Sequence, residues 1–252
     1  MTFTLGPRAI PAGYRLAAFD NVGSTNAEAL ARARAGERGP MWFVTSEQTA
    51  GRGRRNRPWI APRGNLASSI LEVMEISPSV AATLGFVGGL AIEAALRKVS
   101  VEASLRSAGS DHLDFFLKWP NDVLAGQKKL VGIGTNVVAA PEGTPTPATS
   151  LAALGVQITA EELFAELSDF WTEFRGIWDG GRGFGEIRNL WLARAAGLGQ
   201  AVAISSGGAT IEGTFDTLDE QGCMIVRTPA GRRVLISAGD VYFGSVASVG
   251  AG

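Results

Sequence analysis

The pattern of the sequence changes near Gly197, and this change limits the architectures that the chain can adopt. Before it, apolar stretches of strand length alternate with longer stretches of helical length. After it come short stretches rich in β-branched residues, separated by turns that contain Gly, Asp or Pro. About fifty residues of this kind, with four or five strands, suit a small β-barrel. We therefore expect two domains, residues 1–197 and 198–252, with strands in the second at Ala201–Ser205, Ala209–Leu218, Cys223–Thr228 and Arg232–Ser237.

The first domain is expected to be of the α+β class, with a mixed sheet and packed helices. The residues Ser24-Thr25-Asn26 are typical of a helix cap and precede a helix over Ala27–Ala35. A capping box that begins at Thr159 precedes a second helix, which runs to Trp178. We further expect helices at Ser77–Val99 and Phe184–Ala196, a polar loop at Ser104–Asp111, and strands at Leu16–Phe19, Met41–Ser46, Asn65–Val73, Leu113–Trp119 and Leu130–Ala139.

Composition excludes several classes of protein. Lys and Arg number 23 and Asp and Glu 24, and the net charge of -1 argues against a dedicated nucleic-acid binder. The single cysteine, Cys223, excludes a disulfide framework, and any histidine-based triad or metal site would depend on His112 alone. No apolar run approaches the ~18 residues of a membrane span, and residues 1–20 have no signal-peptide core. We therefore expect a cytoplasmic protein that does not bind a membrane.

A loop rich in glycine and arginine follows the strand that ends near Ser46. Its sequence is Gln48-Thr49-Ala50-Gly51-Arg52-Gly53-Arg54-Arg55. Guanidinium groups and the backbone amides that glycine leaves accessible bind phosphate or carboxylate groups well. A solvated basic loop, or a loop that binds the backbone of RNA, would have the same composition. The pattern by itself therefore favours anion binding only modestly.

A second motif, Lys118-Trp119-Pro120-Asn121-Asp122, lies where a predicted strand ends. The chain has only four lysines against 19 arginines, and three of the four lie within twelve residues. We place Lys118 and Lys129 on the two limbs of a hairpin, where like charges need an anionic ligand or a carboxylate partner. The alternative is that Asn121 and Asp122 form a simple turn. The cap residues Ser24-Thr25-Asn26 could likewise bind the polar head of a ligand at a helix N-terminus.

Taken together and in this order, these motifs resemble the biotin–protein ligase family. The resemblance also includes Lys129-Leu130-Val131-Gly132-Ile133 and Gly132-Ile133-Gly134-Thr135-Asn136-Val137, and it extends over roughly residues 15 to 245. It implies a class II synthetase-like catalytic domain followed by a small SH3-like β-barrel.

The resemblance also implies a two-step reaction. Biotin and ATP form biotinyl-5′-AMP with the help of Mg²⁺, and a lysine of a biotin carboxyl carrier domain then takes the biotin. No helix-turn-helix segment precedes the first strand, so we expect no DNA binding, and a homodimer is possible. The family pattern assigns the catalytic role to Lys129 and Arg54. It assigns biotin binding to Ser24, Thr25, Asn26, Gln48, Gly51, Arg52, Gly53, Arg54, Lys129, Gly132 and Gly134. Nucleotide binding is assigned to Arg54, Arg57, Trp59, Asn121, Asp122 and Asn136, with Asp122 also at the metal.

One departure from the family pattern follows Ile133. A strand and turn of roughly a dozen or more residues, which would separate the two glycine motifs, is missing, either through a true deletion or because a loop is absent from the sequence given. Without this segment, a non-catalytic homologue is one alternative to an active biotin–protein ligase. A lipoate or octanoyl ligase, and a nucleic-acid-binding protein that uses the loop Arg52–Arg63, are the others.

Overall fold

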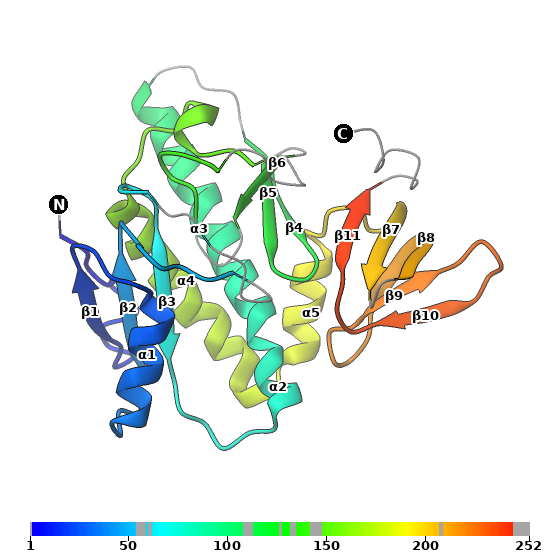
Figure 1. Ribbon diagram of the computed structural model, residues 1–252, viewed down its shortest axis with the longest axis horizontal. Helices are drawn as coiled ribbons and strands as arrows, with labels where there is room; N and C mark the ends of the chain where they lie inside the picture. The colour runs from blue at the N-terminus through cyan, green and yellow to red at the C-terminus, as the bar shows by residue number, and fades with distance from the viewer. Residues whose placement is uncertain are drawn as a thin grey trace.

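The computed structural model describes residues 2–53, 59, 62–107, 113–125, 128–131, 135–141, 148–206 and 209–243, with the backbone alone at 107 and 128–131. Strands and helices alternate up to residue 192, and a run of strands follows (Figure 1). The helices are α1 (Thr25–Arg34), α2 (Pro78–Ala82), α3 (Leu84–Ser107), α4 (Ala160–Trp178) and α5 (Phe184–Leu192), with short 3-10 turns at Ala152–Leu154 and Asp179–Gly181. The strands are β1 (Arg15–Phe19), β2 (Met41–Thr45), β3 (Ala67–Leu71), β4 (Phe115–Lys118), β5 (Asp122–Ala125), β6 (Lys128–Val131), β7 (Ala201–Ser206), β8 (Ala209–Leu218), β9 (Met224–Arg227), β10 (Arg233–Ile236) and β11 (Asp240–Phe243).

The first sheet lies between α1 and α4. Strand β1 runs parallel to β2, and β2 runs antiparallel to β3. Trp42 of β2 packs edge-on against Phe164 and Trp171 of α4, with ring centroids 5.5 and 5.8 Å away. Helix α1 contacts β2 and β3. Because side chains alternate along a strand, the neighbour of Trp42, Phe43, points to the α1 face.

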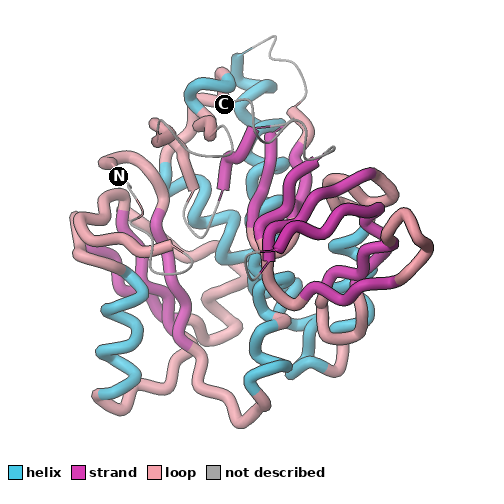
Figure 2. The backbone as a smooth tube through the Cα atoms, turned by 45° about the vertical axis from the view of Figure 1, so that its right-hand side comes forward, coloured by secondary structure: helices cyan, strands magenta, loops and turns pink. Residues whose placement is uncertain are grey.

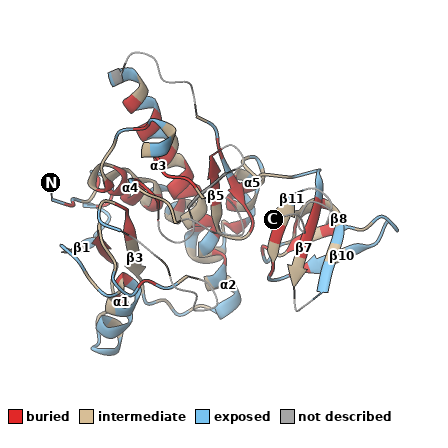
Figure 3. Ribbon diagram, turned by 45° about the horizontal axis from the view of Figure 1, so that its top comes forward, coloured by how far each residue is buried: buried red, intermediate tan, exposed pale blue. Residues whose placement is uncertain are grey.

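Helix α3 forms the centre of the core, where it contacts α4, α5, β4 and β5 (Figure 2). Buried residues line it along most of its length (Figure 3). A Cβ atom on Gly89 would lie 3.5 Å from both Leu117 and the indole nitrogen of Trp191, so the small residue lets β4 and α5 approach the helix closely.

The helix is longer than the sequence suggested. Ser104 to Ser107 are helical, so the expected loop over these residues was wrong, and residues 108–112, which include His112, lie outside the described residues. The Ser104 hydroxyl donates to the Ser100 carbonyl one turn earlier, which satisfies the polar side chain within the helix. Our expectation of no long apolar run was also wrong. The stretch Pro78–Arg106 could cross a membrane by length and composition alone, but half of its apolar window is buried inside the protein, as in a core helix.

Helix α4 begins as the sequence predicted. The Thr159 hydroxyl accepts a hydrogen bond from the Glu162 amide, and the Glu162 carboxylate accepts one from the Thr159 amide at 2.7 Å. The second of these bonds lowers the pKa of Glu162. This confirms the capping box, which satisfies two amides that the first helical turn leaves without partners.

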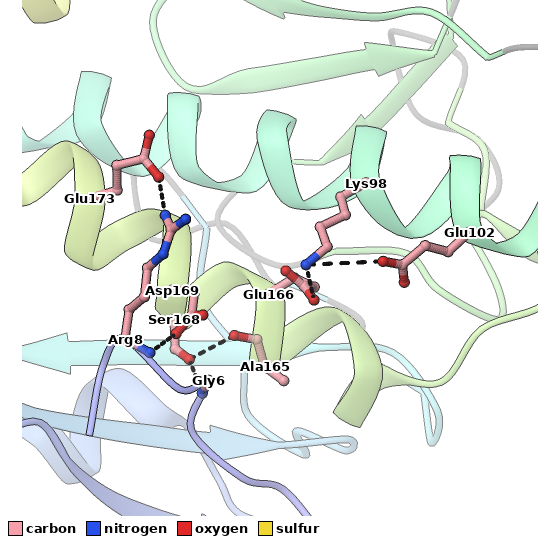
Figure 4. Close-up of polar contacts among 9 residues, drawn as sticks. All are labelled: Gly6, Arg8, Lys98, Glu102, Ala165, Glu166, Ser168, Asp169 and Glu173. Carbon is pink, nitrogen blue, oxygen red and sulfur yellow. Dashed lines mark hydrogen bonds and ion pairs between the residues drawn. The ribbon is translucent and has the colours of Figure 1, made fainter. Parts of the chain in front are cut away.

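Polar contacts hold the N-terminal segment and α3 against the outer face of α4 (Figure 4). The Gly6 amide donates to the Ser168 hydroxyl at 2.8 Å, and the Arg8 amide donates to the Asp169 carboxylate at 2.8 Å. From α3, Lys98 reaches Glu166 at 2.7 Å, and this hydrogen bond raises the pKa of the lysine. These contacts fix the chain that leads into β1.

The second sheet is an antiparallel meander in the order β4-β5-β6. We had expected Lys118 and Lys129 on paired limbs of one hairpin, and this was wrong. The four-residue strand β5 pairs with β4 on one side and β6 on the other, so the two lysines occupy the outer strands. The sequence Asp122-Val123-Leu124-Ala125 is too short to show a clear alternation, and this is why it was taken for a connection.

The strand expected over Leu130–Ala139 was also wrong in its second half. Strand β6 ends at Val131, and Thr135 forms an isolated antiparallel bridge with Leu66. After Thr135, the side-chain carboxamide of Asn65 forms the hydrogen bonds to the backbone that a neighbouring strand would otherwise form. It accepts from the amides of Val138 and Ala139 and donates to the Ala139 carbonyl at 2.7 Å.

The last sheet is antiparallel, in the order β10-β9-β8-β7-β11, and we call it the C-terminal sheet. Its first four strands confirm the pattern read from the sequence. Strand β11 was not among the four ranges and pairs with β7. Helix α5 ends at Leu192, four residues earlier than expected, because the chain that follows it pairs with Leu117 of β4 instead.

Candidate functional site

One group of polar residues lies where β1 and β2 end. The Ser24 hydroxyl accepts from the Ala27 amide at 3.5 Å, which confirms the predicted cap of α1. The next residue, Thr25, is 3% exposed. Its amide and its hydroxyl both donate to the side-chain oxygen of Gln48, at 2.8 and 3.1 Å. Asn26 lies exposed on the first turn of the helix.

Gln48 reaches Thr25 because of the parallel pairing of β1 and β2. Parallel strands end at the same edge of a sheet, so the segments that follow them meet there. Val22 bridges Gln48, and the Ala50 amide donates to the Gly23 carbonyl at 2.8 Å. With its oxygen occupied by Thr25, the Gln48 carboxamide has an NH₂ group that donates to none of the described residues and can bind another partner.

Ser69 completes this group, and sequence reasoning missed it. The Thr25 and Ser69 hydroxyl oxygens lie 2.9 Å apart. Ser69 of β3 pairs with Phe43, so it shares the face of the sheet that α1 covers. The only signal in the sequence is a pair of serines in an otherwise apolar strand. We call Thr25, Gln48 and Ser69 the hydroxyl–amide cluster.

The start of the glycine–arginine loop borders this cluster. The Trp59 amide donates to the Gly51 carbonyl at 2.9 Å, which closes the loop on itself. A Cβ atom on Gly51 would lie 2.8 Å from the Gln48 side-chain nitrogen and 2.7 Å from the Trp59 carbonyl oxygen, so no larger residue fits. Arg52 is exposed and Gly53 is half-buried. Arg54 and Arg57 lie outside the described residues.

A second group follows β4. Lys118 is 7% exposed, pairs in register with Asp122, and its ammonium lies 5.8 Å from the centroid of the Phe243 ring. Asn121 lies beside the start of α3, since its side-chain oxygen is 4.0 Å from where a Cβ of Gly85 would be. Lys129 occupies β6 opposite Leu124. Gly132 and Gly134 lie outside the described residues.

Asn136 follows Thr135, which bridges Leu66 just before β3, and it is 2% exposed. Its side-chain nitrogen donates to the Thr149 carbonyl at 3.2 Å. Its side-chain oxygen is buried and accepts no hydrogen bond from the part of the chain that the structure describes. A buried acceptor of this kind usually has a partner, so the position suits a donor supplied by a ligand.

The structure therefore unites some of the predicted residues and not others. Thr25 and Gln48 are hydrogen-bonded, Gly51 touches Gln48, and Trp59 touches Gly51. Lys118 and Asp122 are neighbours across a sheet. Within the described ranges, no hydrogen bond joins the hydroxyl–amide cluster to Asn121 or Asn136.

Comparison with known proteins gives consistent matches over most of the chain. Residues 24–151 match the biotin/lipoate A/B protein ligase family, and residues 197–244 match the biotin protein ligase C-terminal domain. A biotin--[acetyl-CoA-carboxylase] ligase of Paracoccus denitrificans is 36% identical, with 88% of this chain and 97% of that protein covered. A protein of the same name from Mycobacterium tuberculosis is 33% identical, with 87% and 85% covered. The structure of biotin protein ligase from Aquifex aeolicus with biotin and ATP matches with a TM-score of 0.71 at 23% identity, covering 91% of this chain and 99% of that one.

Proposed function

Because the chain belongs to the biotin/lipoate A/B protein ligase family, we propose that it is an ATP-dependent biotin–protein ligase. It activates biotin as biotinyl-5′-AMP and transfers the biotin to a lysine of a biotin carboxyl carrier protein. The observation that carries this proposal is the 36% identity to a biotin ligase over nearly the whole length of that relative. The match of residues 197–244 to the biotin ligase C-terminal domain favours biotin over lipoate.

The biotin site that we propose is built around the hydroxyl–amide cluster. Ser24, Thr25, Asn26 and Gln48 would bind the polar end of biotin, with Ser69 holding the Thr25 hydroxyl in place. Gly51, Arg52, Gly53 and Arg54 would cover the ligand from the loop, and Lys129, Gly132 and Gly134 would complete the site. The hydrogen bonds that orient Gln48 before any ligand binds support this assignment, since a preoriented amide loses less freedom on binding.

The nucleotide site that we propose combines Arg54, Arg57, Trp59, Asn121, Asp122 and Asn136. The buried oxygen of Asn136, which accepts no hydrogen bond from the described residues, supports its part in this site. The described residues contain no group of three or more His, Cys, Asp or Glu side chains that could hold a metal ion. Mg²⁺ binds through one or two carboxylates, phosphate oxygens and water, so Asp122 fits an ion that arrives with ATP. When bound, this ion would neutralise charge on the pyrophosphate.

In the reaction, a carboxylate oxygen of biotin attacks the α-phosphorus of ATP and pyrophosphate leaves. Both reactants are anions, so the step needs cations placed where charge develops. Lys129 and Arg54 would supply them. The carrier lysine then attacks the acyl carbon as a neutral amine, an amide forms, and AMP leaves. Arg52 and its neighbouring glycines would shield the anhydride from water.

Several finer assignments follow from the same proposal. The first domain would have the class II synthetase-like arrangement and the C-terminal sheet that of an SH3-like barrel. We place the boundary between residues 197 and 198, in the connection between α5, which ends at Leu192, and β7, which begins at Ala201. The protein would act in the cytoplasm without binding DNA, and a homodimer is possible.

The test is an assay of the purified chain with biotin, ATP, Mg²⁺ and a biotin carboxyl carrier domain. We expect pyrophosphate release, and a mass gain of one biotin on the carrier that requires its target lysine. Lys129→Ala should abolish adenylate formation, and full retention would refute the site assignment. Binding of biotin and ATP without any adenylate would identify a non-catalytic homologue. Tighter binding of lipoate than of biotin in calorimetry would favour the lipoate ligase.

A further inference from the structure

The chain between α5 and the C-terminal sheet is attached to the strand that precedes Asn121 and Asp122. The Leu117 amide donates to the Arg194 carbonyl at 2.9 Å, and the Ala196 amide donates to the Leu117 carbonyl at 2.8 Å. Leu117 thus bridges Ala195 in parallel while it pairs with Val123 on its other side. The connection to the C-terminal sheet therefore extends the β4-β5-β6 sheet rather than forming a free linker.

A buried hydrogen bond makes a second attachment. The indole nitrogen of Trp119, a residue 3% exposed, donates to the carbonyl of Gly222 at 3.0 Å. Gly222 lies in the turn between β8 and β9, and its φ of +80° is one that favours glycine. A Cβ there would lie 2.5 Å from the ring of Phe86 and 3.3 Å from that of Phe184. The turn therefore packs directly on α3 and α5.

Phe243 makes a third attachment, from the end of β11. Its ring lies beneath the Lys118 ammonium at 5.8 Å, close to the outer limit of a cation–π contact. The same ring lies so close to Gly197 that a Cβ there would collide with it. Three consecutive residues, Leu117 to Trp119, are thus each in contact with the C-terminal sheet or its connection.

We propose that Trp119 is a positioning residue through which the C-terminal sheet sets the place of Asn121 and Asp122. This rests on the proposed function, in which that turn binds the nucleotide. Only Pro120, whose ring fixes one of its two backbone angles, separates Trp119 from Asn121. A shift of the indole is therefore passed to the turn with little loss. The contacts need no residue of the C-terminal sheet to touch the nucleotide.

The test compares two buried indoles. Trp119→Phe keeps an aromatic side chain, smaller than the indole, and removes the bond to Gly222. The control, Trp171→Phe, removes the bonds from a buried indole of α4 to the Tyr14 hydroxyl at 3.0 Å and to the Glu72 carboxylate at 3.4 Å, beside the chain that leads into β1. We expect Trp119→Phe to raise the KM for ATP about tenfold, with biotin affinity unchanged within about twofold. Trp171→Phe should lower thermal stability to a similar degree and leave the KM for ATP unchanged.

A second pair varies the other side of the contact. Gly222→Ala and Gly231→Ala place a side chain at φ values of +80° and +77°, but nothing lies within 4 Å of the Cβ at position 231. Both should suffer similar backbone strain, and only Gly222→Ala should raise the KM for ATP. If the wild type is active and the two variants of each pair change the KM for ATP to the same extent, the positioning role is overturned and the proposed function stands. A wild type that forms no biotinyl-5′-AMP would overturn the proposed function and this role with it.

Discussion

Replacing Thr25 by Val tests whether the hydroxyl–amide cluster binds a ligand or only caps a helix. Val has nearly the shape of Thr, so the buried side chain keeps its packing and loses only its hydroxyl. That hydroxyl donates to Gln48 at 3.1 Å and lies 2.9 Å from the Ser69 hydroxyl. The Thr25 amide still holds Gln48 at 2.8 Å, so the carboxamide is loosened rather than released.

The magnitude follows from these contacts. Each neutral hydrogen bond contributes about 0.5–1.5 kcal/mol to stability, so the variant should lose about 1–3 kcal/mol of unfolding free energy. If Gln48 binds biotin, the loosened carboxamide must be reoriented on binding. We expect the Kd for biotin to rise about tenfold, which corresponds to about 1.4 kcal/mol.

Urea unfolding and titration calorimetry with biotin measure the two effects separately. The control is Thr172→Val, which removes a hydroxyl that donates to the Ser168 carbonyl at 2.8 Å within α4. It should lower stability without changing the Kd for biotin. A Thr25→Val protein that is destabilised but binds biotin as tightly as the wild type would show that this hydroxyl serves the fold alone.

Three further predictions concern charge and burial. Glu93 is 1% exposed and forms ion pairs with Arg194 and Arg97. Glu93→Gln should therefore lower the unfolding free energy measured in urea by about 2 kcal/mol. An unfolding free energy equal to that of the wild type within error would contradict this. Burial raises the pKa of the Cys223 thiol. The rate of its alkylation should therefore rise with pH around a midpoint above the usual thiol value of ~8.5. A midpoint below that value would refute the effect of burial. The hydrogen bond from Arg15 holds the pKa of Glu37 at about 2. The stabilisation of the fold by this ion pair is therefore complete above the ordinary glutamate pKa of about 4.3 and is lost as the pH falls toward 2. The unfolding free energies of the wild type and Glu37→Gln should therefore become equal in acid. A difference between them that does not change with pH would contradict the pairing.

Local signals in the sequence predicted local structure well. The Thr159 capping box and the Ser24 cap are complete within four residues, so their helices begin where expected. Element ends were less certain where a distant partner decides them. Helix α5 stops at Leu192 because the next residues pair with Leu117, more than seventy residues earlier. Nothing within the helix itself encodes that competition.

The candidate site shows the same division. Thr25 and Gln48 belong to separate motifs, and the parallel strands bring them together. Ser69 carries no pattern of its own and becomes visible only through the register of β3 with β2. The bond from Trp119 to Gly222 spans over a hundred residues and depends on how two sheets dock. Such a contact cannot be predicted from the spacing of residues along the chain.

The short connection after β6 ties the two three-stranded sheets together. Only three residues separate Val131 from Thr135, too few for the strand and turn that the family pattern predicts after Ile133. An extended chain advances about 3.3–3.6 Å per residue, so Val131 lies within about 14 Å of the Thr135–Leu66 bridge. That bridge immediately precedes β3, which carries Ser69. Strand β6 and Lys129 are thus held close to the sheet of the hydroxyl–amide cluster by chain length alone. If the wild type forms biotinyl-5′-AMP, this short connection suffices in place of the strand that the family pattern predicts.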